Sequence, residues 1–137
     1  MKRFMLVGLS LVGLAAPALA HHSMAMFDKG QAIQLTGTVK KMLWTNPHSW
    51  LHIMVRQPDG SEVEWSLESQ PPVDLLREGW KRNSVKAGDK VTVVASPLKD
   101  GRPGGSLINV TLPDGMVLGR PVDPRQITQK IPAHASK

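Results

Sequence analysis

Apolar and polar residues alternate along most of the chain between residues 32 and 118, and this two-residue period is typical of strands with one buried face. The clearest example is the stretch 32–45, which alternates through Ile33 and Leu35 and then changes phase at Met42. A change of phase within a strand indicates a bulge or bend. We therefore expect the fold to begin with one long, bent strand.

Further alternating stretches follow at regular intervals. The stretch 50–56 is apolar on both faces, which favours a central strand, and the turn sequence 58–60 (PDG) separates it from the stretch 63–67. This pattern predicts a β-hairpin. Later strands are expected at residues 91–95 and 107–112, with a short edge strand at 116–118.

One segment has helical character instead. Ser69 is a typical capping residue, and Pro71 and Pro72 are tolerated only in a first helical turn. Gly79 suits the left-handed conformation that ends a helix, after which Trp80 would fold back on the helix. The pattern predicts one short helix of about two turns over residues 69–78.

Three strands, a short helix and two or three further strands match the plan of the OB-fold. We therefore expect a mainly β protein: a small OB-like barrel of five or six strands, with one short helix between strands 3 and 4. The barrel domain is predicted to span residues 32–118, with a leader at 21–31 that is rich in histidine and methionine. Residues 119–137 contain three prolines and no apolar period, so we expect a flexible tail.

The first twenty residues resemble an export signal. A basic start (Lys2, Arg3) precedes an apolar run too short to span a bilayer, and Ala18 and Ala20 occupy the cleavage positions. The processed protein is then expected to begin at His21, to be periplasmic or secreted, and to have no membrane anchor. We expect an exported protein of this kind to bind no nucleic acid.

Composition narrows the chemistry. Cysteine is absent, which excludes disulfides, thiolate metal sites and a cysteine nucleophile. Removing Lys2 and Arg3 leaves 15 basic residues against 11 acidic ones, a mild net charge of +4 that favours solubility. No nucleophile elbow, metalloprotease helix or phosphate-binding loop is present, so we predict a binding module rather than an enzyme.

Histidine and methionine form the strongest candidate site. Imidazole nitrogen and thioether sulfur select copper over magnesium or calcium, and a terminal histidine adds its free α-amino group. The leader supplies two adjacent histidines and two methionines, and two more histidines flank Trp50. Copper, or another soft or borderline divalent metal, is therefore the expected ligand. The candidate ligands are His21, His22, Met24, Met26, His48 and His52.

The two strand histidines also have ordinary structural explanations. Four residues of straight strand separate them by roughly 13 Å, so they cannot share one ion unless the chain bends at Pro47. Each could instead join the leader. Alternatively, His48 hydrogen-bonds within its loop, and His52 is a partly buried strand residue hydrogen-bonded to a neighbour.

The alternative to a metal site is an envelope adaptor or a glycan-binding module. Tryptophan supplies four of the six aromatic residues, and large rings on a barrel face can stack a sugar. The candidate ligand face consists of Trp44 and Trp50 with the loops around His48 and residues 99–105. At least two of the four tryptophans are expected in the interior. The convergence in space of His21, His48 and His52, or of exposed tryptophans, distinguishes the two hypotheses.

Several short motifs resemble a known family. They are an HHS start after the signal, LTGTV at 35–39, WTNPH at 44–48, GW at 79–80, GD at 88–89 and TLPDG at 111–115. This combination is similar to a family of small exported bacterial proteins classed as a domain of unknown function. The resemblance implies export and a β-barrel fold but no established activity.

Overall fold

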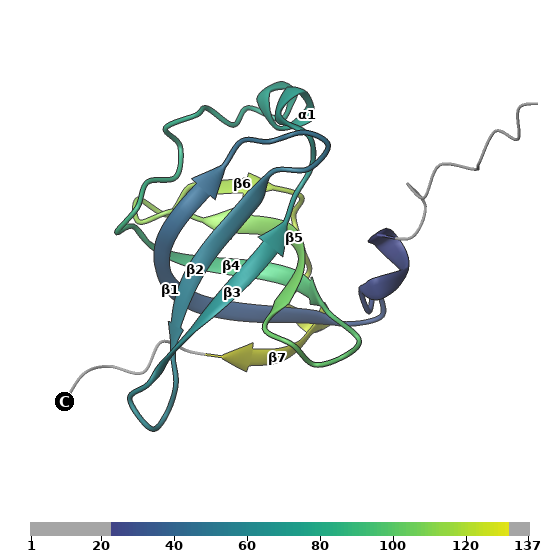
Figure 1. Cartoon of the computed structure of the whole chain (residues 1–137), viewed down its shortest axis with the longest axis vertical. Helices are drawn as coiled ribbons and strands as arrows, with labels where there is room; N and C mark the ends of the chain where they lie inside the picture. The colour runs from purple at the N-terminus through teal and green to yellow at the C-terminus, as the bar shows by residue number, and fades with distance from the viewer. Residues whose placement is uncertain (1–22, 132–137) are drawn as a thin grey trace, which may run out of the picture.

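The computed structural model describes residues 23–131, which form a small barrel built from one seven-stranded sheet (Figure 1). The strands are β1 (Ala32–Leu43), β2 (Trp50–Arg56), β3 (Glu62–Glu68), β4 (Lys90–Pro97), β5 (Gly104–Thr111), β6 (Val117–Gly119) and β7 (Ile127–Ile131). The helical elements are η2 (Ser23–Met26), α1 (Pro72–Arg77) and η3 (Pro124–Gln126). No helix within this described part is long and apolar enough to cross a membrane.

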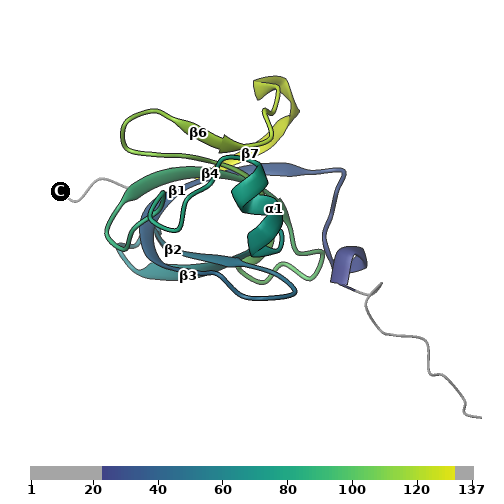
Figure 2. The same ribbon diagram turned by 90° about the horizontal axis from the view of Figure 1, so that it is seen from above.

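Five of the strands close into a ring in the order β1, β2, β3, β5, β4 and back to β1. Neighbours in the ring pair antiparallel, except where β3 meets β5 in a short parallel stretch. Figure 2 shows the ring from above, with α1 lying across its opening. The predicted mainly β barrel, with one short helix between strands 3 and 4, is confirmed.

The first strand behaves as its sequence pattern predicts. Its register against β2 shifts between Val39 and Lys41, which is the bulge implied by the change of phase. Gly37 lies at a close approach, because a Cβ there would stand 2.5 Å from the carbonyl oxygen of Met54. This glycine therefore allows β2 to pass tightly over β1 where the sheet curls.

The helix is shorter than predicted and is capped differently. It begins after Pro71 without a side-chain cap, because Ser69 is used elsewhere: its backbone N–H donates to the carbonyl of Ser49. At the other end Gly79 has φ +88°, and the N–H of Trp80 donates to the carbonyl of Leu75 at 3.0 Å. The predicted left-handed stop and the return of Trp80 onto the helix are both present.

The interior is filled by the inward faces of the ring strands, closed at one end by Leu75 and Trp80. Trp44 and Trp65 are partly buried and pack against this core. The prediction that at least two tryptophans contribute to the interior is confirmed. The fully buried aliphatic residues include Leu35, Leu51, Ile53, Val55, Leu67, Val93 and Val110.

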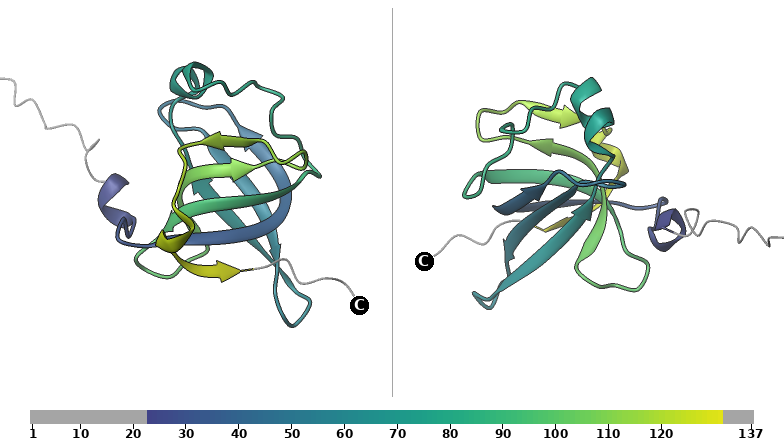
Figure 3. Two further views of the ribbon diagram at one scale, coloured as in Figure 1. Left: turned by 180° about the vertical axis from the view of Figure 1, so that it is seen from behind. Right: turned by 45° about the horizontal axis from the view of Figure 1, so that its top comes forward.

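The chain beyond Gly119 differs from the expected loose tail. Residues 127–131 form β7, which pairs in parallel with the start of β1, as the rear view in Figure 3 shows. Asp123 caps the short η3 turn by accepting from the N–H of Arg125, and Ile127 and Ile131 are half-buried. Two apolar residues four apart are too sparse a pattern to indicate a strand in the sequence.

Candidate functional site

The loop between β1 and β2 holds His48 against the end of β3. The hydroxyl of Thr45 donates to the carbonyl of His48 at 2.8 Å. Ser49 is fully buried, and its backbone hydrogen-bonds to the residues that follow β3. The N–H of Ser49 donates to the carbonyl of Gln70, and the carbonyl of Ser49 accepts from the N–H of Ser69. These contacts fix the position of His48 although it lies in a loop.

His48 is paired with a buried carboxylate. Its Nδ1 lies 2.7 Å from Oε1 of Glu68, whose side chain is only 8% exposed, whereas the imidazole is 32% exposed. A buried carboxylate needs a partner to offset its lost hydration, and here the imidazole supplies it. A histidine that donates Nδ1–H to a carboxylate is oriented to offer Nε2 to a ligand, which is the usual arrangement behind a metal-binding histidine.

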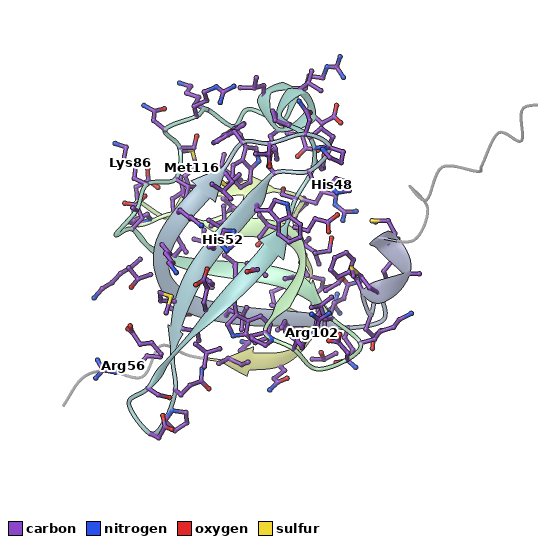
Figure 4. The ribbon with its side chains drawn as sticks, viewed as in Figure 1. His48, His52, Arg56, Lys86, Arg102 and Met116 are labelled. Atoms are coloured by element: carbon purple, nitrogen blue, oxygen red, sulfur yellow. The ribbon has the colours of Figure 1, made fainter. Side chains whose placement is uncertain are left out.

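His48 and Glu68 line a cavity of about 240 Å³, which we call the His48 cavity. Within it Gln70 donates from Nε2 to Oε1 of Glu78 at 2.8 Å, and the buried indole N–H of Trp80 has no acceptor among residues 23–131. Figure 4 shows His48 on the side of the barrel that faces η2. The lining residues are Met24, His48, Glu68, Ser69, Gln70, Pro71, Leu75, Glu78, Trp80, Ser106, Leu107, Ile108, Gly119 and Arg120.

The leader is anchored to the barrel next to this cavity. Phe27 is buried (3% exposed) and bridges to Leu98, while Asp28 donates its N–H to the carbonyl of Pro97 at 2.8 Å. The anchored turn places Met24 at the His48 cavity. Met26, two residues on, lines a different cavity. The structure therefore separates the two leader methionines.

His52 belongs to another environment, on the outer face of β2. Its Nδ1 lies 3.0 Å from Oε1 of Glu64 and 3.1 Å from the hydroxyl of Ser66. Burial lowers the pKa of His52, and the positive charge of Lys41 lowers it further, against the opposing effect of Glu64. Figure 4 shows His52 over the middle of β2 and β3, apart from His48. His52 is therefore a partly buried strand residue that is hydrogen-bonded to its neighbours, as its ordinary structural explanation predicts.

The two tryptophans of the alternative ligand face have different surroundings. Trp44 packs against the core, and the guanidinium of Arg82 lies over its ring, 5.6 Å from the centroid. Trp50 alternates with fully buried Leu51 and therefore points outward. The residues 44 and 50 do not form a shared stacking surface.

Among the sequence-predicted ligands, the structure brings together Met24 and His48 but not Met26 or His52. His21 and His22 lie outside the described residues. Within residues 23–131, no three acidic or histidine side chains gather in a way that could hold a metal ion. A site of three or more such ligands at His48 would need side chains from outside these described residues.

Glu68 is the site residue that sequence reasoning missed. Acidic residues on a strand near a turn are usually solvated, and Glu68 follows the same alternation as Glu62 and Glu64. The signal was in the hairpin register, which pairs Trp50 with Glu68 and so places this carboxylate close to the chain that carries His48.

Comparison with known proteins identifies a family but no function. A model of one protein family, described as a family of unknown function (DUF6152), matches residues 9–107, a segment that includes His48 and Glu68. No curated protein and no solved structure gives a significant match. Because the matched segment is well over half of the chain, the protein belongs to the family of unknown function DUF6152.

Proposed function

We propose that this protein is an exported binding module that captures copper, or a similar borderline divalent metal, between its N-terminal histidines and the barrel. The observation that supports this most strongly is that Met24 of the leader and His48 of the β1–β2 loop line one cavity. The leader is anchored at Phe27, three residues after Met24.

His22 and His21 precede Met24 by two and three residues. An extended chain spans at most about 3.6 Å per residue, so His22 reaches up to about 7 Å from Met24 and His21 up to about 11 Å. His48 would supply Nε2, oriented by Glu68, and the histidines and free amine of the leader would supply further nitrogens. Met24 adds a thioether, a soft ligand that favours Cu(I).

Export is part of the proposal because it creates the terminal amine. The basic start, the short apolar run and the small residues at 18 and 20 support cleavage before His21. Cleavage there exposes an α-amino group next to the His21 imidazole. An amine and imidazoles together make the nitrogen-rich environment that Cu(II) prefers.

The test is a Cu(II) titration of protein purified from the periplasm, with His48→Ala compared against His52→Ala. Both histidines contact a glutamate through Nδ1, but only His48 lines the cavity beside Met24, so His52→Ala is a matched control. We expect His48→Ala to weaken Cu(II) binding at least tenfold and His52→Ala to leave it within twofold. Equal affinities in all three proteins would remove His48 from the site.

A second comparison uses the two methionines under reducing conditions. Met24→Leu and Met26→Leu keep similar volume and remove the sulfur, and only Met24 lines the His48 cavity. We expect Cu(I) binding to weaken with Met24→Leu and to stay unchanged with Met26→Leu. Weaker Cu(I) binding with Met26→Leu and unchanged binding with Met24→Leu would identify Met26 as the sulfur ligand instead.

A further inference from the structure

Two further cavities lie on either side of the loop between β4 and β5, residues 98–103. One, of about 390 Å³, contains Trp50 from the outer face of β2, and we call it the Trp50 cavity. The other, of about 360 Å³, contains Trp65 from β3, and we call it the Trp65 cavity. Leu98 and Arg102 line both. The loop is therefore a ridge with one tryptophan on each side.

Backbone hydrogen bonds attach the ridge to the leader and to the start of β5. Leu98 donates its N–H to the carbonyl of Gly104 at 3.0 Å, and Lys99 donates to the carbonyl of Met26 at 2.9 Å. Gly104 packs closely here: a Cβ would lie 2.8 Å from Cδ1 of Leu98 and 3.2 Å from the carbonyl oxygen of Ser66, so a side chain there would displace Leu98. A preformed surface loses little conformational freedom when a ligand binds.

The groups around the ridge suit a sugar chain. A sugar ring has an apolar face that stacks on tryptophan and a rim of hydroxyls that hydrogen-bond to amides and cations. Besides the two tryptophans, the Trp65 cavity carries Gln31, Gln129 and Lys99. The exposed guanidinium of Arg102, whose side chain is 69% exposed, stands between the two cavities.

The charge pattern favours an acidic sugar over a nucleic acid. Single-stranded nucleic acids also stack on aromatic rings, but the grooves that bind them line many cations along the backbone. Here Lys99 and Arg102 are the cations that line the two cavities, Arg102 pairs with Asp100 at 2.8 Å, and Asp28 adds a negative charge. Two cations suit a sugar chain that carries a carboxylate on some of its units better than a nucleic acid, which carries one phosphate on every nucleotide.

We infer that the ridge formed by residues 98–103 binds an acidic oligosaccharide, with one sugar stacked on Trp50, another on Trp65, and a carboxylate near Arg102. Trp50 lies on the outer face of strands 2 and 3, and the ridge is the loop between strands 4 and 5; barrels of this topology use both places for oligosaccharides and oligonucleotides. Trp65 pairs with buried Ile53 and reaches the ridge from the inner face of β3, so the sugar chain would cross the ridge from one tryptophan to the other. The inference is independent of the metal site, because the residues that carry it do not line the His48 cavity.

The test is calorimetric titration of the purified full-length protein with hexagalacturonate, using cellohexaose as the neutral comparison. We expect the acidic chain to bind more tightly than the neutral one. Arg102→Gln should remove that preference. Trp50→Leu and Trp65→Leu, which remove the flat ring but keep apolar volume, should each weaken binding at least tenfold.

Trp44→Leu is the control, because Trp44, like Trp65, packs against the core but lines neither cavity. It should bind the hexasaccharide as the unchanged protein does, and circular dichroism checks that every variant is folded. The inference is overturned if neither saccharide binds at millimolar concentration, or if Trp50→Leu and Trp65→Leu both bind the saccharide as the unchanged protein does. Tryptophan-dependent binding of oligo-dT without saccharide binding would likewise overturn it.

Discussion

At the scale of single residues, the decisive contact is the one between His48 and Glu68. Because Glu68 is buried and lies 2.7 Å from Nδ1, it fixes which imidazole nitrogen faces outward. Replacing a carboxylate that orients a metal-binding histidine typically costs 10–100-fold in metal affinity. We therefore predict that Glu68→Gln lowers Cu(II) affinity about 10–100-fold in a titration.

The control for this prediction is Glu64→Gln. Glu64 contacts His52 in the same way but lies outside the His48 cavity, so its substitution should change Cu(II) affinity less than twofold. If Glu68→Gln and Glu64→Gln weaken binding equally, the carboxylate acts through overall charge and not through the orientation of His48.

His52 predicts a pH dependence of stability. Its folded-state pKa is lowered below the ordinary value of 6.5, first by burial and then by Lys41, against the opposing effect of Glu64. Below pH 6.5 the unfolded chain therefore takes up a proton more readily than the folded protein. The stability contributed by neutral His52 is present above pH 6.5 and is lost as the pH falls through the lower, folded pKa.

This dependence is measurable by urea denaturation at pH 7.5 and pH 5.5. We expect the free energy of unfolding to be smaller at pH 5.5 in the unchanged protein. His52→Gln should reduce the difference between the two pH values. A difference of the same size in both proteins would show that His52 titrates alike in the folded and unfolded chains.

At the scale of elements, the leader is a docked segment, and Phe27 is what docks it. Truncating a buried phenylalanine typically lowers stability by about 3–5 kcal/mol. The single β-bridge between Phe27 and Leu98 is too small to offset this loss. Phe27→Ala should therefore release the leader while the barrel stays folded. Hydrogen exchange should show faster exchange of the amides of Asp28 and Lys99, which bond across the bridge, but not of the β2 amides. Phe27→Leu should retain most of the protection.

The regular elements were predictable from the sequence where one face is buried. The alternation around Leu51 and the turn at residues 58–60 gave the hairpin, and Gly79 gave the end of the helix. The start of the helix and β7 were not predictable. Ser69 is a good cap by composition, but its backbone pairs with Ser49, and this contact is set by tertiary structure.

The site was predictable only in part, for a related reason. Residue type pointed to His48 and Met24, but spacing along the chain could not separate them from His52 and Met26. The barrel distinguishes these residues. Strand alternation places His52 on the outer face of β2, and the contact between Phe27 and Leu98 holds the leader so that Met24 and Met26 line different cavities. Glu68 needed the hairpin register, which joins residues far apart in sequence.

At the scale of the whole molecule, the proposed metal site depends on where the processed chain begins. Cleavage after Ala20 predicts a product that starts at His21, and intact-mass measurement of protein recovered from the periplasm decides this directly. A product that retains the apolar run at residues 4–15, or one that starts beyond His22, would remove the terminal amine from the proposed site.

We propose that the start of the processed chain and the barrel form one metal site. It is tested most directly by Cu(II) affinities of four periplasmic proteins: unchanged, with one glycine added before His21, His48→Ala, and both changes together. Sites that act independently give additive losses, within about 0.3–0.5 kcal/mol. We predict that each change alone weakens binding at least tenfold and that the combined loss departs from additivity. Additive losses, or a His48→Ala protein that binds as tightly as the unchanged one, would contradict a shared site.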